Sequence, residues 1–130
     1  MKGGGNQVYE INFYQNEKGY SETVSWIREL DAKALKDKDS RIRLKKLYEY
    51  MELLKNYGTH IGQPMVKHLT GTELWELRPS RDRIIFAAIQ DNVFLILNHF
   101  EKKTEKTPRR EIEKANRMLS DYKERSKKHE

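Results

Sequence analysis

The sequence predicts an α+β fold, in which a helical hairpin and a C-terminal helix pack on a small antiparallel sheet. Two observations lead to this prediction. Apolar residues recur at helical spacing before Gly58 and again after residue 108, whereas residues 65–100 carry the alternating and continuously apolar runs of strands. Turn-forming residues, Gly58 and Asp91-Asn92, separate these runs. The expected order is β-α-α-β-β-β-α, with the helices on one face of the sheet.

The first half of the chain predicts one strand followed by two helices. Residues 8–14 hold β-forming residues in weak alternation, which is typical of a strand. Ser21 is a favourable N-cap for the first helix, and Asp39 or Ser40 for the second. Gly58 is placed to end the second helix. Only a short charged link joins the two helices, so we expect an antiparallel hairpin.

The second half predicts three strands and a final helix. Residues 74–78 alternate between apolar and charged side chains, and residues 83–90 are mostly apolar, as in a central strand. Residues 93–100 return antiparallel after a tight turn at Asp91-Asn92. Thr107-Pro108 has the residue types of a helix start, with threonine as N-cap and proline at the first helical position.

Length and charge narrow the class of protein. A chain of 130 residues is expected to form one domain. We assign residues 1–7 to a flexible leader, residues 8–125 to the domain and residues 126–130 to a charged tail. The formal net charge is +6. Such an excess favours nucleic acid, anionic lipid or an acidic protein as the partner.

The residue types exclude several kinds of site. The sequence has no cysteine, which removes disulfides, thiolate chemistry and sulfur-ligated metal sites. No spacing of histidines and carboxylates is typical of a metal site, and we expect no cofactor. The longest apolar stretch, Ile84–Ile89, is too short to cross a bilayer. We therefore expect a cytoplasmic protein without membrane contact.

Cationic side chains concentrate in the stretch that predicts the strands. Arg78 and Arg83 flank the turn at residues 79–82, so they are expected to lie close together. Lys102 and Lys103 follow the strand that pairs beside that of Arg83, which brings them toward the same edge. Guanidinium groups offer phosphate a rigid fork of donors. The sequence thus predicts a phosphate-binding site. Alternatively, Arg78 pairs with Glu76 or Glu73 across the sheet and the lysines only solvate a loop.

Two histidines lie in different surroundings. His99 is in an alternating strand and is expected to be a packed or hydrogen-bonded sheet residue. His68 stands beside Lys67 at a loop or at the start of a strand. This is a better position for chemistry, because an imidazole near solvent can move protons at neutral pH.

Two blocks of sequence are similar to a known toxin family. They are Leu-Trp-Glu-Leu-Arg at residues 74–78 and Phe-Glu-Lys-Lys-Thr-Glu-Lys-Thr-Pro at residues 100–108, accompanied by Lys67-His68-Leu69 and Arg83-Ile84-Ile85-Phe86. Together they resemble the HigB branch of the RelE/ParE toxin superfamily, including its phage-derived Gp49-like members, over nearly the whole chain. The resemblance implies the RelE-like fold and the toxin of a type II toxin–antitoxin system.

The resemblance also implies an activity. Such toxins are endoribonucleases that cut translated mRNA, usually in the ribosomal A site, and an antitoxin holds them inactive. For the HigB branch this partner is a helix-turn-helix protein (HigA-like). The toxins use no metal, because the ribose 2′-hydroxyl attacks its own phosphate. That chemistry requires a base, cations for the phosphorane and an acid for the leaving oxygen.

Carried over onto this sequence, the resemblance assigns roles to four cations. Arg83 falls at the phosphate-stabilising position, where Arg78 would assist. Lys103, with Lys102 beside it, falls where the family has an arginine that serves the leaving group. Further residues expected to bind the RNA are Arg81, Lys106 and Arg109.

Two departures from RelE leave the proton acceptor open. RelE has lysines on the strand where this chain has Leu74 and Glu76, and its stacking tyrosine is replaced here by Arg109. HigB-type members generally lack that full set. Lys67 or His68 would then take the proton, with Glu76 as a weaker candidate.

Two other functions use the same residues. One is a ParE-like inhibitor of DNA gyrase, which binds protein and cuts nothing. The density of cations around the strands is less suited to this function. The other is a non-catalytic module that binds RNA or the ribosome through the same basic patch.

Overall fold

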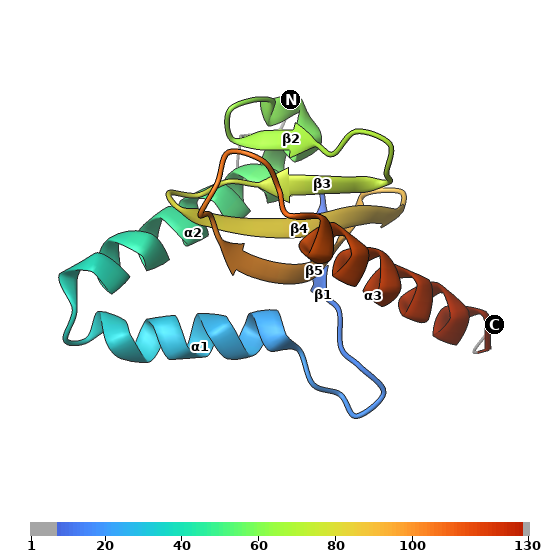
Figure 1. Cartoon of the computed structure of the whole chain (residues 1–130), viewed down its shortest axis with the longest axis horizontal. Coiled ribbons are helices and arrows are strands. Elements are labelled where there is room, and N and C mark those ends of the chain that lie inside the picture. The colour runs from blue at the N-terminus through green and yellow to red at the C-terminus, as the bar shows by residue number, and fades with distance from the viewer. Residues whose placement is uncertain (1–7, 129–130) are drawn as a thin grey trace.

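A five-stranded sheet lies between two helical layers in the computed structural model, which describes residues 8–128 (Figure 1). The elements in chain order are β1 (Glu10–Phe13), α1 (Glu22–Ala34), α2 (Lys38–Tyr57), the 3-10 helix η1 (Gly58–Ile61), β2 (Val66–His68), β3 (Leu74–Leu77), β4 (Asp82–Gln90), β5 (Val93–Glu101) and α3 (Arg109–Lys128). The strands lie in the order β1-β5-β4-β3-β2, with β1 parallel to β5 and the other pairs antiparallel. The predicted class, with a hairpin and a C-terminal helix on the sheet, is confirmed. The expected leader lies outside the described residues.

Short polar residues start both helices of the hairpin. Ser21 caps α1 as predicted, and its hydroxyl accepts from the backbone N–H of Val24 at 3.1 Å. α2 begins earlier than predicted, because the carboxylate of Asp37 accepts from both the Asp39 N–H and the Ser40 hydroxyl. Asp37 is therefore the cap, and the two residues predicted for this role lie in the first turn.

Gly58 ends α2 as predicted, for two physical reasons. Its φ of 63° lies in the left-handed region, which favours glycine. A Cβ at this position would also lie 2.6 Å from the ring of Tyr9. The turn at Asp91-Asn92 links β4 to β5 as predicted, and Asn92 has a φ of 62°.

The sheet buries apolar side chains on both faces. α1 and α2 cover one face, where the buried core consists of Leu47, Leu54, Val66, Leu77, Ile84, Phe86, Phe94 and Ile96. α3 covers the other face, where the buried core consists of Leu69, Leu74, Ile85, Ala87, Leu95, Leu97, Ala115 and Leu119. The prediction that all helices lie on one face is therefore wrong. Successive residues of β4 alternate between the two cores, and a strand buried on both sides needs a cover on each.

The sheet contains one strand that the sequence did not predict. β2 is three residues long, which is too short to show an alternating pattern. It forms by pairing antiparallel with β3, so that Lys67 lies opposite Glu76 and His68 opposite Trp75. This strand, and not a loop, therefore sets the direction of the Lys67 and His68 side chains.

α3 begins slightly later and ends later than predicted. Its first residue is Arg109, and the carbonyl of Pro108 accepts from the N–H groups of Glu111 and Ile112. The helix reaches Lys128, so residues 126–128 of the expected tail are helical. Across residues 8–128, no helix combines the length and the apolar character needed to span a membrane.

Candidate functional site

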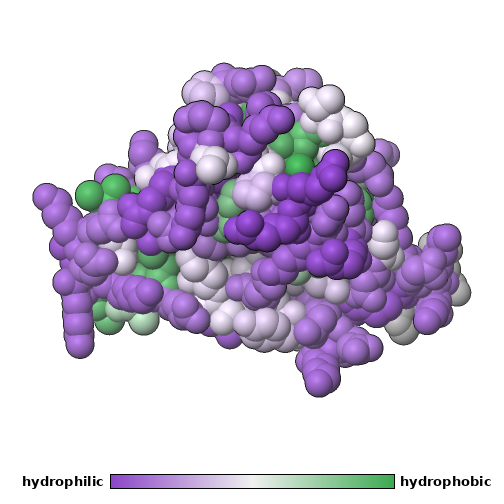
Figure 2. All heavy atoms as spheres, viewed as in Figure 1, coloured by the Kyte–Doolittle hydropathy of each residue, from purple (hydrophilic) through white to green (hydrophobic). Residues whose placement is uncertain are grey.

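An open groove of about 1220 Å³ lies on the α3 face of the sheet, between the β2 edge and the start of α3. Its charged lining consists of Lys67, Arg78, Glu105, Lys106, Arg109, Arg110 and Glu113. We call it the cationic groove, because cations outnumber carboxylates in it. Strongly hydrophilic residues gather over the start of α3 (Figure 2). Such an excess of positive charge in a hollow attracts phosphate-bearing ligands.

Strand register brings the predicted cations to this face. Lys67 lies opposite Glu76, and Glu76 lies opposite Ile85, which belongs to the core under α3. Opposed residues on neighbouring strands share a face, so Lys67 and Glu76 project toward α3. Every second residue of a strand also shares a face, so Arg78 and Arg83 project the same way.

Arg83 is almost buried, with 8% of its surface exposed. Its Nη1 donates to the carbonyls of Ser80 and Asp82, both at 2.8 Å. Burial lowers the pKa of the guanidinium and the charge of Arg78 lowers it further, while nearby carboxylates oppose the shift. The two arginines thus lie close enough for their charges to interact. Within residues 8–128, Nε and Nη2 of Arg83 donate no hydrogen bond, and Arg83 lies behind Arg78 rather than among the residues that line the cationic groove.

Glu76 is a buried carboxylate with two partners. Its Oε2 accepts from the Thr107 hydroxyl at 2.7 Å, and its Oε1 lies 3.5 Å from Nε of Arg78. The second contact is an ion pair without a well-formed hydrogen bond, since Nε of Arg78 is buried and unsatisfied within the described structure. Glu76 therefore acts as a counter-ion, and Thr107 binds it instead of capping α3. This arrangement does not favour Glu76 as a proton acceptor.

Lys102 and Lys103 lie on the loop that leads from β5 to α3. The Lys102 N–H donates to the carbonyl of Arg81, and its ammonium lies 3.3 Å from Glu105, which lines the cationic groove. Lys103 is exposed and is not in the groove lining. The loop borders the groove, so both lysines lie at its margin.

Two predicted site residues lie away from the cationic groove. His68 projects to the opposite face, where its ring centroid is 5.0 Å from that of Trp75, and its Nε2 is hydrogen-bonded to the carbonyl of Thr72 at the edge of the groove, at 2.7 Å. Arg81 is held by Asp39 at 2.6 Å and by Glu101 at 2.8 Å. The side chains of His68 and Lys67 therefore point to opposite faces of the sheet. Arg81 is likewise separated from Arg78 and Arg83.

The sequence did not point to Arg110 or Asn98. Arg110 lines the groove beside Arg109. Asn98 is fully buried on β5, and its Nδ2 donates to Oε1 of Glu111 at 3.0 Å. Its Oδ1 has no partner in the described part of the chain. The signal for Asn98 was present, because it is a polar residue directly after the apolar run of a central strand.

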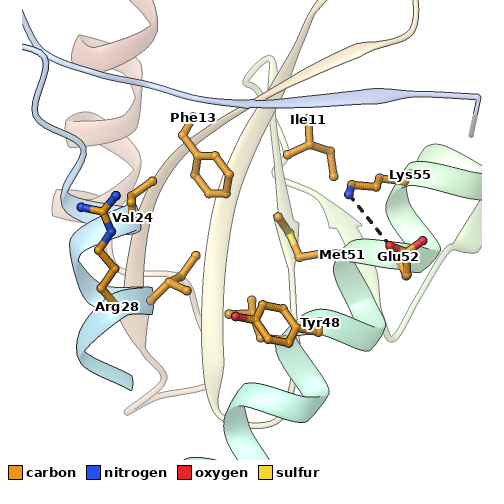
Figure 3. Close-up of a pocket in the computed structure, with 10 residues that line it drawn as sticks. Ile11, Phe13, Val24, Arg28, Tyr48, Met51, Glu52 and Lys55 are labelled. Atoms are coloured by element: carbon orange, nitrogen blue, oxygen red, sulfur yellow. Dashed lines mark ion pairs between the residues drawn. The ribbon is translucent and has the colours of Figure 1, made fainter. Parts of the chain in front are cut away.

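A second hollow, of about 480 Å³, lies on the hairpin face and is apolar (Figure 3). Its apolar lining consists of Ile11, Phe13, Val24, Ile27, Leu47, Tyr48 and Met51. Arg28 and the ion pair between Lys55 and Glu52 lie at its margin. Within residues 8–128, no group of three or more histidines and carboxylates is arranged to hold a metal ion. The cationic groove is therefore the described hollow best suited to a polyanion.

The fold and this groove define a small α+β protein with a basic surface suited to phosphate. A comparison with family models agrees: the family described as "Phage derived protein Gp49-like (DUF891)" matches residues 25–120. The chain belongs to this family, which is one of RelE/HigB-like toxins. The match runs from α1 into α3 and includes every residue of the cationic groove. No curated protein matches the chain.

Proposed function

We propose that this protein is the toxin of a type II toxin–antitoxin system and cleaves ribosome-bound mRNA in the cytoplasm. The observation that supports this most directly is the pair of Arg78 and Arg83 beside the cationic groove. A pentavalent phosphorane carries more negative charge than the phosphodiester from which it forms. Fixed guanidinium groups therefore stabilise the transition state more than the ground state.

The roles of the other cations follow from their positions. Arg83 directs its free N–H groups at the scissile phosphate, and Arg78 adds a second charge from the groove lining. Lys67 lies in the groove whereas His68 projects to the other face, so Lys67 is the candidate for the base: its neutral amine, formed when the ammonium has released its own proton, accepts the 2′-hydroxyl proton. Lys102 and Lys103 at the margin serve the leaving oxygen. The reaction is an internal transfer and requires no metal.

The decisive experiment replaces Arg83. Induced expression of the wild-type protein is expected to arrest growth, and Arg83→Ala is expected to abolish the arrest while the circular dichroism spectrum stays unchanged. Arg28→Ala, on the hairpin face, removes the same charge far from the cationic groove and is expected to remain toxic. Full toxicity of Arg83→Ala would contradict this mechanism.

Primer extension on a transcript expressed in the same cells separates the alternative functions. Discrete cleavages that vanish in Arg83→Ala support the endoribonuclease. A DNA-damage response without cleavages indicates a gyrase inhibitor. Growth arrest with neither result indicates a module that only binds RNA or the ribosome.

The partner in this scheme is a helix-turn-helix antitoxin, as the family resemblance implies. The apolar hollow of the hairpin face is a surface on which a protein partner can bury nonpolar side chains. RNA, with its charged backbone, is less suited to such a surface. Co-expression with the product of a neighbouring reading frame, followed by purification of the tagged toxin, tests this. Recovery of the toxin alone would argue against an antitoxin from that frame.

A further inference from the structure

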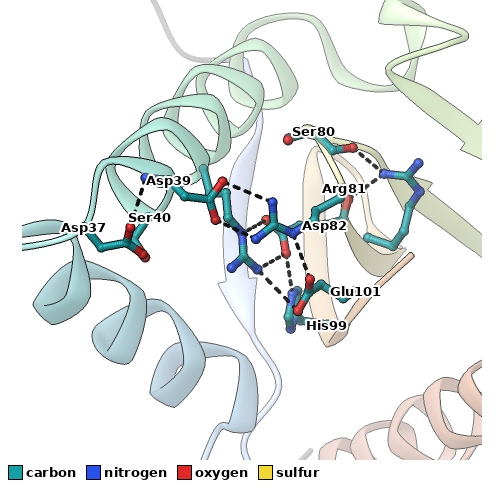
Figure 4. A network of polar contacts seen from close by, with 10 residues as sticks. Asp37, Asp39, Ser40, Ser80, Arg81, Asp82, His99 and Glu101 are labelled. Atoms are coloured by element: carbon teal, nitrogen blue, oxygen red, sulfur yellow. Dashed lines mark hydrogen bonds and ion pairs between the residues drawn. The ribbon is translucent and has the colours of Figure 1, made fainter. Parts of the chain in front are cut away.

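Asp82, the first residue of β4, has a carboxylate that is buried on the hairpin face (Figure 4). Its Oδ1 lies 2.6 Å from Nη2 of Arg43 and 3.0 Å from Nε2 of His99, and its Oδ2 accepts from Nε of Arg43 at 3.0 Å. Burial alone would raise the pKa of Asp82, but the hydrogen bonds from His99 and Arg43 hold it below its ordinary value. The carboxylate therefore stays ionised at neutral pH.

Both donors belong to rigid elements. Arg43 is part of α2, and the ring of His99 stacks on Trp26 of α1, with centroids 3.4 Å apart and planes 12° apart. A bulge in β5 turns His99 to this face, opposite Ile84. His99 is thus a packed and hydrogen-bonded sheet residue, as the sequence predicted. Asp82 is fixed relative to both helices of the hairpin.

The same residue also takes part in holding Arg83. The two residues are adjacent in β4, so their side chains project to opposite faces of the sheet. Arg83 donates to the backbone carbonyls of Asp82 and Ser80. Ser80 has a φ of 58°, in the left-handed region that residues other than glycine seldom adopt. The orientation of the guanidinium therefore depends on a turn that is anchored through the Asp82 side chain.

We propose that Asp82, held from the hairpin face by Arg43 and His99, is a positioning residue that fixes the Arg83 guanidinium on the opposite face. This inference rests on the proposed function, because it takes Arg83 as the group that contacts the phosphate. Asp82 itself contacts no RNA. A carboxylate is required because it accepts two bonds from Arg43 and one from His99, whereas an asparagine side chain has one acceptor oxygen and a donor group that faces these donors.

The same turn offers a matched control. Asp39 accepts from Arg81, next to Asp82 in the chain, at 2.6 Å. This pair is exposed, and such pairs contribute little to stability or to geometry. Asp39→Asn therefore removes one carboxylate charge, contributed by α2 to Arg81 of this turn, and breaks no hydrogen bond of the buried cluster.

The activity test compares purified variants in ribosome-dependent cleavage of a defined mRNA. Asp82→Asn is expected to lower kcat by about 10- to 100-fold, the cost of a displaced catalytic group, with KM for the substrate nearly unchanged. Arg43→Lys keeps the charge but loses the two-point contact with Asp82. Its kcat is expected to lie between those of Asp82→Asn and the wild type. Asp39→Asn is expected to keep wild-type kcat. Equal losses in Asp39→Asn and Asp82→Asn would overturn the proposal.

A second readout does not depend on activity. The ¹⁵N NMR signal of Arg83 Nε, assigned through its loss in Arg83→Lys, reports the surroundings of the guanidinium. It is expected to shift or broaden in Asp82→Asn and to stay in place in Asp39→Asn. If Asp82→Asn does not fold, Arg43→Lys takes its place in this comparison. An unchanged Arg83 signal would overturn the positioning role even if kcat falls. A wild-type protein that cleaves no RNA, with an Arg83 signal that shifts as expected, would instead overturn the proposed function and leave the positioning role intact.

Discussion

The two faces of the sheet use positive charge in opposite ways. On the hairpin face, Arg43 and Arg81 are satisfied by three carboxylates, those of Asp39, Asp82 and Glu101. On the α3 face, no carboxylate of residues 8–128 lies within ion-pair distance of the groove cations Lys67, Lys106 and Arg109. A cation held between two carboxylates, as Arg81 is, has little left to offer a phosphate. Arg78 has one such partner, Glu76, and its guanidinium still lines the groove. Free charge, and not total charge, therefore makes the α3 face the better suited of the two to a polyanion.

The largest expected effect tests whether the hairpin-face cations are structural. Asp82→Ala leaves Arg43 and His99 without their shared acceptor in a buried site, so the free energy of unfolding in urea is expected to fall by about 3–5 kcal/mol. Asp39→Ala removes an exposed partner and is expected to change it little. Equal losses of unfolding free energy in the two variants would show that the buried ion pair stabilises the protein no more than the exposed one.

A smaller loss of stability is expected on the α3 face. Thr107→Val keeps the shape of the side chain but removes the hydrogen bond to the Glu76 carboxylate. Hydrogen bonds to charged groups contribute about 1.5–3 kcal/mol, and thermal or urea unfolding measures the change. Thr104→Val, whose hydroxyl bonds to an exposed carbonyl nearby, is the control and is expected to have a weaker effect. An unchanged free energy of unfolding in Thr107→Val would show that the bond to Glu76 does not stabilise the loop between β5 and α3.

RNA binding distinguishes the faces without any cleavage. Lys67→Ala and Arg109→Ala are each expected to weaken the binding of a short single-stranded RNA, and each is expected to reduce the slope of log K against log salt by about 0.7. Fluorescence anisotropy at several salt concentrations gives both quantities. Arg28→Ala, at the apolar hollow, is expected to leave the slope unchanged. A slope that drops equally in all three variants would mean that binding does not select the α3 face.

The smallest effect concerns acid stability. The pKa of Asp82 is lower in the folded protein than its ordinary value, so the folded state favours the ionised carboxylate. This contribution is complete above the ordinary pKa of aspartate, at about pH 4, and is lost as the pH falls through the folded pKa. Asp82→Asn is therefore expected to lose less stability than the wild type as the pH falls below about 4, as measured by urea unfolding. If the free energy of unfolding falls with pH in the same way in both proteins, the loss of stability in acid is due to groups other than Asp82.

Local sequence signals were sufficient for several elements. Ser21 and Gly58 act through their own backbone and side chain, so a cap and a helix end are visible without knowledge of the partner elements. The alternation of residues 74–78 likewise predicted that Arg78 shares a face with Glu76. The structure shows an ion pair between these two residues, so this part of the alternative interpretation of Arg78 is confirmed. The arginine is paired, yet its guanidinium still lines the groove.

Signals that depend on a partner strand or on total burial were insufficient. β2 has three residues and exists only because it pairs with β3, so the opposite directions of Lys67 and His68 were not apparent. Which face α3 covers also depends on the whole sheet, since β4 is apolar on both sides and its sequence does not say which helix lies on which side.

The sequence by itself determined the α+β class, most element limits, the basic character of the chain and the proximity of Arg78 to Arg83, because these depend on spacing and on neighbours along the chain. Only the tertiary structure decided which cations remain free. Asp39 and Glu101 reach Arg81 from α2 and β5, at positions 42 and 20 residues away in the chain, and so neutralise its charge. Ion pairs between residues so far apart in the chain depend on how the elements pack, and a local sequence pattern cannot predict them.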